Sequence, residues 1–193
     1  MNREKAIKTI MMSVVASESV VISTTGLISR EIFERFDSDR NFYVPGSMGL
    51  ASSIGLGLAV SCPKERIVVI DGDASLLMNL GSMVTIGNRH PVNLLHIVID
   101  NGAYGSCSEE KSMSDSAHLD KLAINVGYKK TYIVENEKNL KDAILESGDG
   151  PVFVLAKIEL GGRRDFKRPL KLPELKERLM KSLERDKEKN HDV

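Results

Sequence analysis

The sequence predicts an α/β fold with a doubly wound, mainly parallel sheet and helices on both faces. Apolar runs of strand length recur along the chain, helical patterns separate them, and two of the runs end in polar residues at Gly72-Asp73 and Asp100-Asn101. Strands that are apolar throughout are typical of a sheet covered on both faces. Regular alternation of strands and helices is typical of parallel connections.

The N-terminal half of the chain supplies five expected elements. Apolar residues three or four apart predict helices around residues 7–14 and 27–36, because that spacing places them on one helical face. Between them, residues 19–23 form a short apolar run that predicts a strand. Residues 44–59 begin as a turn and continue as a helix of small residues, and residues 66–70 predict a second strand.

The C-terminal half continues the alternation and ends in a charged helix. Expected strands cover residues 94–99, 131–134 and 152–158, and expected helices cover residues 76–88, 118–126 and 137–146. A stretch rich in glycine and arginine, residues 161–169, interrupts the pattern. The charged helix is expected to begin near Pro173 and to fray after Asp186.

Length and charge indicate one domain without a polyanionic partner. A chain of 193 residues can bury one substantial core, which we place at residues 1–170, followed by a charged helix and tail at residues 171–193. The 27 basic and 27 acidic residues cancel, so the charge favours neither nucleic acid nor a membrane surface. We see no signal-peptide pattern, and Cys62 and Cys107 are too few for a disulfide scaffold. A cytoplasmic protein is expected.

Two strand-end segments carry the residues that indicate chemistry. Asp71-Gly72-Asp73-Ala74-Ser75 and Asp100-Asn101-Gly102-Ala103-Tyr104-Gly105 each follow an apolar strand. Open α/β folds bind ligands at the carboxyl ends of their strands, and oxygen ligands beside a diphosphate are what Mg²⁺ prefers. Taken alone, Gly72-Asp73 is more typical of a turn with a helix N-cap. The two segments together favour a metal-bridged pyrophosphate site.

These segments resemble the signature of thiamine diphosphate enzymes, in which a Gly-Asp-Gly is followed by an Asn-Asn at about the distance along the chain that separates the two segments here. The chain departs from the signature at Ala74 and Asp100. The resemblance implies that residues 1–170 are the pyrophosphate-binding domain and that the cofactors are thiamine diphosphate and Mg²⁺. It implies metal contacts from the side chains of Asp73 and Asn101 and from the backbone carbonyl of Ala103. It also assigns four further residues to the cofactor site: Gly72, Ala74, Ser75 and Tyr104.

The small-residue segment upstream completes the cofactor site that the resemblance implies. In thiamine diphosphate enzymes the matching segment carries a bulky residue that forces the two cofactor rings into a V shape. Met48 occupies that place, and Gly46 matches the residue whose carbonyl accepts a hydrogen bond from the aminopyrimidine. The alternative for Met48 is a core-filling side chain. A dinucleotide-binding fingerprint is excluded, because Gly55 and Gly57 precede a strand instead of following one.

The resemblance also implies a partner chain. Thiamine diphosphate enzymes bind the cofactor between a pyrophosphate domain and a pyrimidine domain, and the second carries a glutamate that hydrogen-bonds the pyrimidine ring. This chain has room for only the first domain, and its glutamates fall in apparent surface helices. We therefore expect a hetero-oligomer with an α subunit that carries the pyrimidine-binding domain. No catalytic side chain is assigned, because the cofactor carries the chemistry.

Within this family, most of the chain is similar to β subunits of two-subunit sulfopyruvate decarboxylases and to the C-terminal half of phosphonopyruvate decarboxylases. The first similarity implies that a small 2-oxoacid, 3-sulfopyruvate, is converted to sulfoacetaldehyde and CO₂, a step toward coenzyme M. Two alternatives stay open. One is a β subunit of a 2-oxoacid:ferredoxin oxidoreductase, against which the lack of a cysteine cluster counts. The other is a non-catalytic nucleotide-binding module.

A basic loop is the candidate for the second anion of the substrate. Arg164 and Arg168 lie in the glycine-rich stretch after the last strand, and arginine suits tetrahedral oxyanions. The alternative, at least as well supported, is a solvated loop or an ion-pair patch between subunits. Among the histidines, His118 is placed where it can approach the site, whereas His96 is expected to be structural and His191 lies in the tail.

Overall fold

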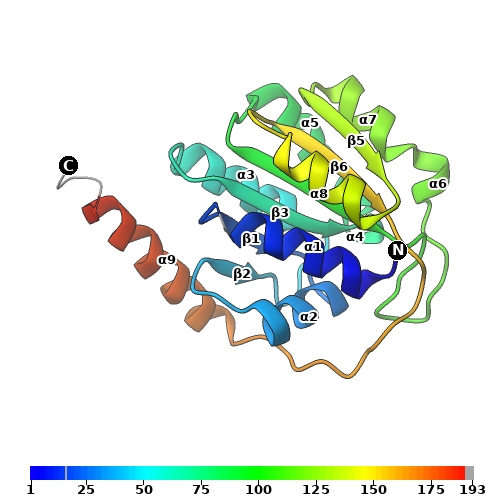
Figure 1. Ribbon diagram of the computed structural model, residues 1–193, viewed down its shortest axis with the longest axis horizontal. Coiled ribbons are helices and arrows are strands. Elements are labelled where there is room, and N and C mark those ends of the chain that lie inside the picture. The colour runs from blue at the N-terminus through cyan, green and yellow to red at the C-terminus, as the bar shows by residue number, and fades with distance from the viewer. Residues whose placement is uncertain (16, 190–193) are drawn as a thin grey trace.

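The computed structural model describes residues 1–15 and 17–189, which contain a six-stranded, fully parallel sheet (Figure 1). The strands are β1 (Val20–Ser23), β2 (Asn41–Tyr43), β3 (Ile67–Gly72), β4 (Leu94–Asp100), β5 (Lys130–Val134) and β6 (Val152–Lys157). They lie in the order β2-β1-β3-β4-β6-β5. The predicted α/β class with a parallel sheet is confirmed.

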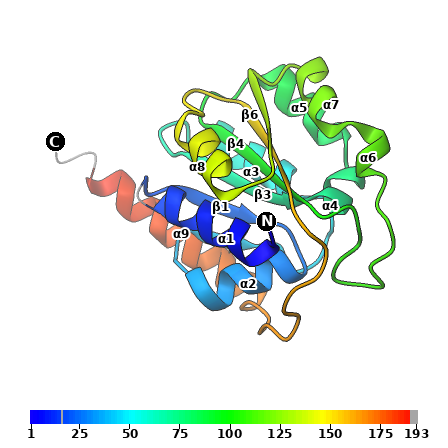
Figure 2. The same ribbon diagram turned by 45° about the vertical axis from the view of Figure 1, so that its right-hand side comes forward.

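The helices pack on both faces of this sheet. In chain order they are α1 (Arg3–Val15), α2 (Leu27–Phe36), α3 (Ala51–Ser61), α4 (Asp73–Leu77), α5 (Gly81–Arg89), α6 (Ser114–Ala117), α7 (Leu119–Val126), α8 (Glu137–Leu145) and α9 (Leu172–Lys189). Figures 1 and 2 show α1, α2 and α8 on one face and α3, α5 and α7 on the other. Each face has its own apolar core, in which side chains such as Ile7 and Met83 are buried. Full burial of one such side chain contributes roughly 1.5–3 kcal/mol to the stability of the fold.

The order of the strands creates a place for a ligand. β1 and β3 are neighbours, and β3 pairs with β4. The chain leaves β1 toward β2 and then crosses back to β3, so the connections after β1 and β3 run to opposite sides. Such a switch point leaves a crevice at the carboxyl ends of the strands, where open α/β folds bind ligands.

The structure differs from the sequence prediction in one strand and in several helices. Neither β2 nor the short helix α6 was predicted. The helix expected at residues 76–88 is two helices, because the chain turns at Met78–Leu80 with Met78 N and Asn79 N donating to Ser75 O and Leu76 O. The helix expected from His118 begins at Leu119, since His118 has a left-handed φ of 46° and separates α6 from α7.

The C-terminal helix extends away from the sheet in Figure 1. Leu175, Leu179 and Leu183, four residues apart, are buried apolar side chains of this helix, Ser182 is buried beside Leu183, and the helix packs against β2. The helix runs to Lys189, and the fraying expected after Asp186 stays a prediction. Residues 190–193 of the predicted tail, with His191, lie outside the described residues.

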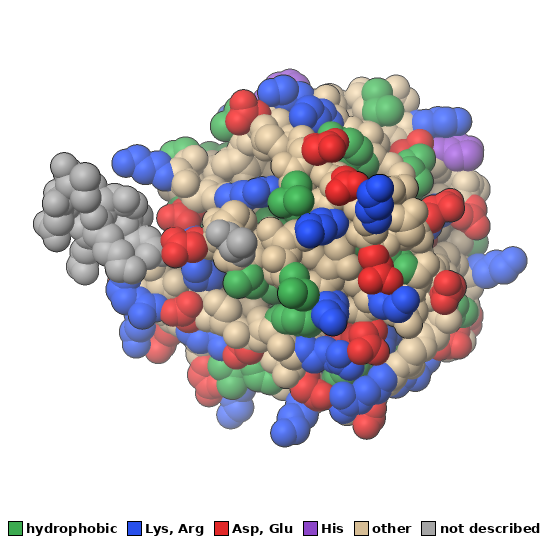
Figure 3. All heavy atoms as spheres, in the orientation of Figure 1, with side chains coloured by type: hydrophobic (Ala, Val, Ile, Leu, Met, Phe, Trp, Pro, Cys, Tyr) green, Lys and Arg blue, Asp and Glu red, His purple; other side chains and the backbone are tan. Residues whose placement is uncertain are grey.

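The face of the molecule seen in Figure 3 carries acidic and basic side chains interspersed, with hydrophobic side chains in small groups between them. No helix in the described part of the chain combines the length and the apolar character needed to cross a membrane.

Candidate functional site

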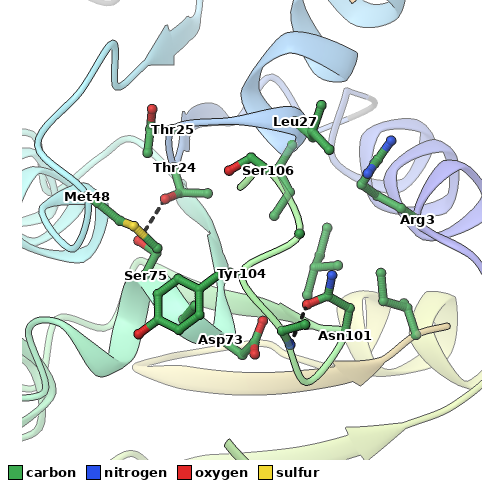
Figure 4. A pocket seen from close by; sticks show the side chains of 17 residues that line it. Arg3, Thr24, Thr25, Leu27, Met48, Asp73, Ser75, Asn101, Tyr104 and Ser106 are labelled. Carbon is green, nitrogen blue, oxygen red and sulfur yellow. Dashed lines mark hydrogen bonds between the residues drawn. The ribbon is translucent and has the colours of Figure 1, made fainter. Parts of the chain in front are cut away.

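A pocket opens at the carboxyl ends of β1, β3 and β4 (Figure 4). Eight of the residues predicted for the cofactor line it: Met48, Gly72, Asp73, Ala74, Ser75, Asn101, Ala103 and Tyr104. Gly46 is exposed and does not belong to the lining. The structure therefore brings together two strand-end segments and a turn that are far apart in the sequence.

Asp73, the first residue of α4, is the most perturbed acid of the pocket. Its side chain is buried, its Oδ2 accepts a hydrogen bond from Ser112 Oγ, and the backbone N–H groups of Ala74 and Asn101 also hydrogen-bond the carboxylate. Burial, with the nearby charge of Asp100, outweighs these hydrogen bonds and raises the pKa of Asp73 to about 6. A cation bound here would stabilise the ionised form.

Asp100, in contrast, has a basic partner. Lys157 Nζ lies 2.7 Å from its Oδ2, and Ser114 Oγ donates to its Oδ1 at 2.9 Å. In the part of the chain that the structure describes, no basic side chain forms an ion pair with Asp73. Asp100, where the sequence departs from the family signature, is thus paired with Lys157, whereas Asp73 has no basic partner among the described residues.

Ser75 fixes the turn that carries Met48. Its Oγ lies 2.8 Å from Thr24 Oγ1 at the end of β1 and accepts a hydrogen bond from Gly49 N at 3.1 Å. Asn79 Nδ2 donates to Gly49 O at 3.0 Å from the break between α4 and α5. Figure 4 shows the Met48 side chain beside Ser75 at the edge of the pocket. Met48 is only partly buried and lines the pocket, which favours a side chain facing a ligand over the core-filling alternative.

Asn101 begins a compact loop. Its Oδ1 accepts a hydrogen bond from Ala103 N at 3.1 Å, and Ser112 N returns to Gly102 O at 2.8 Å. The loop therefore closes on itself next to Asp73, and it places Ala103 and Tyr104 along the pocket.

A third strand end, not predicted from the sequence, contributes to the pocket. Thr24, Thr25 and Leu27, which follow β1, also line the pocket. Leu27 opens α2, and the N-cap of that helix, Gly26, has no side chain to satisfy the first backbone N–H groups. Such a helix N-terminus is suited to an anion. The signal was present, since Thr24-Thr25-Gly26 follows an apolar strand and precedes a helix.

One glutamate contradicts the expectation that all glutamates lie on the surface. Glu31 on α2 is buried, and its Oε2 accepts a hydrogen bond from Arg3 Nε at 2.8 Å. Arg3 itself reaches the pocket wall. A buried carboxylate requires such a partner, and pairing explains why Glu31 is tolerated inside the fold.

The remaining candidates do not line the pocket. Arg164 forms an ion pair with Glu109, and Arg168 is exposed with no hydrogen bond or ion pair to any described residue. His118 is exposed and does not line the pocket. His96 is buried, with Nδ1 3.0 Å from Tyr128 Oη and Nε2 3.9 Å from Asp71 Oδ2. Its position inside the sheet fits the structural role expected for it.

These donors fit a diphosphate with a divalent metal. Asp73 supplies a buried carboxylate whose ionised form lacks a cation, Asn101 supplies an amide oxygen, and the start of α2 supplies free backbone N–H groups. A hard cation prefers such oxygens and leaves other positions to water and phosphate. Asp73 and Asn101 would hold the metal, and Thr24, Thr25 and the start of α2 would face the phosphates.

Comparisons with known proteins agree with this geometry. Residues 28–156 match a family described as "Thiamine pyrophosphate enzyme, C-terminal TPP binding domain". Sulfopyruvate decarboxylase subunit beta of Methanocaldococcus jannaschii is 44% identical over 136 residues, which cover 68% of this chain and 72% of that protein. Phosphonopyruvate decarboxylase of Streptomyces viridochromogenes is 38% identical over 158 residues, 81% of this chain but only 40% of that protein.

A solved structure shows the same fold. Benzoylformate decarboxylase from Polynucleobacter necessarius superposes with a TM-score of 0.63 and 20% identity, over 86% of this chain and 33% of that chain. This likeness supports the fold alone.

Proposed function

Because this chain belongs to the thiamine pyrophosphate enzymes, through their C-terminal cofactor-binding domain, we propose that it is the β subunit of a two-subunit 2-oxoacid decarboxylase. The observation that carries the proposal is the pocket at the switch point, which Asp73, Asn101 and Leu27 at the start of α2 line together. This arrangement supports the diphosphate half of a cofactor site. An α subunit with the pyrimidine-binding domain would supply the other half, and the two chains would form a hetero-oligomer. With free Cys62 and Cys107, the cytoplasm is the proposed compartment.

The proposed substrate is 3-sulfopyruvate, with sulfoacetaldehyde and CO₂ as products, a step toward coenzyme M. Support comes from the relatives. Three sulfopyruvate decarboxylase β subunits are 40–44% identical to this chain, and two phosphonopyruvate decarboxylases are 36–38% identical. A phosphonopyruvate decarboxylase-like subunit is the second candidate, favoured by the identity of 38% over 158 residues.

The residues of this chain would bind and orient the metal and the cofactor. Bound thiamine diphosphate supplies the covalent chemistry of decarboxylation. Asp73, Asn101 and the carbonyl of Ala103 would hold Mg²⁺, while Gly72, Ala74, Ser75 and Tyr104 would form the wall against the diphosphate. Met48 would support the cofactor in its bent shape. The carbonyl of Gly46, which lies outside the pocket lining, would meet the aminopyrimidine only when the partner closes the site.

The test is reconstitution. The purified chain, alone and mixed with a pyrimidine-domain α subunit, is supplied with thiamine diphosphate, Mg²⁺ and equal concentrations of sulfopyruvate, phosphonopyruvate or pyruvate, and CO₂ release is measured. We expect activity only in the mixture, with the largest kcat/KM for sulfopyruvate.

Three results of this experiment would contradict different parts of the proposal. Turnover by the lone chain, shown free of partner by mass spectrometry, would refute the two-subunit proposal. Preference for phosphonopyruvate would replace the substrate. Failure of the mixture to retain thiamine diphosphate would support the non-catalytic module instead.

A further inference from the structure

The segment after β6 is firmly attached although it has no regular secondary structure. Residues 159–170, here called the crossing segment, contain neither helix nor strand. Phe166 is nevertheless buried, and the guanidinium of Arg163 lies 4.4 Å from the centre of its ring. Arg163 Nη1 donates to Glu34 Oε1 at 2.6 Å, and Arg3 Nη2 donates to Arg163 O. The crossing segment is therefore anchored on α1 and α2.

The loop after β4, residues 102–112, here called the pocket loop, forms one wall of the cofactor pocket. Ala103, Tyr104, Gly105 and Ser106 all line the pocket. On the opposite limb of the loop, Glu109 has a left-handed φ of 60°. The internal hydrogen bonds of the loop join its limbs near the base, for example from Tyr104 N to Glu110 O at 2.8 Å.

Arg164 joins these two parts. Its Nη1 donates to Glu109 Oε1 at 2.5 Å, and its Nη2 donates to Cys107 O at 3.0 Å. One guanidinium thus contacts a side chain and a backbone carbonyl just beyond Ser106. In the described part of the chain, no other hydrogen bond or ion pair connects the crossing segment to the pocket loop. Figures 1 and 2 show both segments on the same side of the molecule.

We propose that Arg164 is a positioning residue for the cofactor site: with Glu109 it forms a latch that ties the pocket loop to the crossing segment and orders the loop for thiamine diphosphate. Binding requires the loop residues at the pocket to hold one conformation, and order that exists before binding reduces the entropy lost on binding. Because Glu109 pairs with the charge of Arg164 and the Cys107 carbonyl fixes the orientation of its guanidinium, Arg164 is assigned to the loop and not to the substrate anion.

The experiment uses Arg164→Gln, Glu109→Gln and the exchanged pair Arg164→Glu with Glu109→Arg, each as a full chain assembled with its α subunit. The control is Arg185→Gln, which removes a similarly exposed ion pair, with Asp39, at α9. Two quantities are measured: deuterium uptake of the peptide spanning residues 102–112, and the Kd of thiamine diphosphate by calorimetry at fixed Mg²⁺.

We expect faster uptake in the pocket loop and a Kd raised about two- to fivefold in both single variants, the range that an exposed ion pair supports. The exchanged pair should recover part of the loss, and Arg185→Gln should match the wild type in both quantities. KM for the 2-oxoacid, at saturating cofactor, should change less than the cofactor Kd.

The latch is refuted if both single variants match the wild type, or if Arg164→Gln raises KM for the 2-oxoacid while leaving loop exchange and cofactor Kd unchanged. The second result would assign Arg164 to the substrate. The inference rests on the proposed cofactor site, but its failure is separable: a wild-type complex that does not bind thiamine diphosphate refutes the site itself, whereas the uptake of the loop still tests the latch.

Discussion

Replacing Asp73 by asparagine should stabilise the protein free of cofactor and abolish binding of the metal–cofactor complex. The carboxylate is 2% exposed and has no basic partner among the described residues, and its pKa is raised from 3.8 to about 6. Two pKa units, at about 1.4 kcal/mol each, correspond to a burial cost of about 3 kcal/mol for the ionised group at neutral pH. Asparagine keeps the shape and an oxygen that accepts from Ser112, but removes the charge.

The expected gain in stability of the Asp73→Asn variant follows from this burial cost. An increase of about 1–3 kcal/mol in the free energy of unfolding raises the Tm of a domain this size by roughly 2–10 °C. The assay is calorimetry at pH 7.5 without Mg²⁺ or cofactor, with Asp149→Asn, a charge removed from an exposed side chain, as control. Asp149→Asn should leave the Tm within about 1 °C, because exposed charges contribute little.

The pH dependence of the Tm difference between the variant and the wild type tests the same effect. The pKa of Asp73 in the folded chain lies above its unfolded value, so the cost is fully present above about pH 6 and disappears as the pH falls toward 3.8. The Tm difference between the variant and the wild type should therefore shrink from pH 7.5 to pH 5. With Mg²⁺ and thiamine diphosphate the wild type should gain stability and the variant should not, since losing a charged ligand weakens binding by more than ~100-fold. A variant that binds the cofactor within tenfold of the wild type, or whose apo form melts lower, would overturn this reasoning.

Three further outcomes are expected. Met48→Ala should lower kcat at least about tenfold while changing the Tm by less than about 2 °C, because the side chain is only partly buried; an unchanged kcat would contradict its role against the cofactor. Arg168→Gln should raise KM for sulfopyruvate more than KM for pyruvate if this exposed residue meets the sulfonate, and equal effects would assign it to solvent. Gly55→Ala should destabilise by about 1–3 kcal/mol, because an added Cβ would lie 2.2 Å from Val69 Cγ2, whereas Gly57→Ala on the open side of α3 should not; equal melting temperatures for the two would refute close packing of this helix.

The sequence predicted the elements whose signal is local. β3 and β4 are buried along their whole length, so their apolar runs predict both the strands and the parallel sheet. β2 escaped prediction because it has only three residues and becomes a strand by pairing with β1. The break at Met78–Leu80 is likewise a tertiary effect, since Asn79 turns its side chain to Gly49 O in a turn far away in the sequence.

The same division applies to the site. Asp73 and Asn101 could be predicted because a polar side chain after an apolar strand is visible in one dimension. The start of α2 was missed because its contribution is backbone N–H groups, which almost any residue supplies. The partners of Arg164 could not be predicted at all. Glu109 and Cys107 lie 55 and 57 positions away, and only the return of the chain after β6 brings the arginine to them.

The two aspartates of the pocket show why a departure from the family signature need not change its chemistry. A carboxylate at position 100, where the signature has an amide, adds a negative charge beside Asp73, and that charge helps to raise the pKa of Asp73. Lys157 at the end of β6 offsets it from 2.7 Å, and Ser114 and Gly102 N hydrogen-bond the other oxygen. Asp100 thus has a basic partner within the chain, whereas Asp73 has none among the described residues and is the acid whose charge a bound cation would balance. A diphosphate adds further negative charge, so metal and cofactor should bind together here more tightly than either alone.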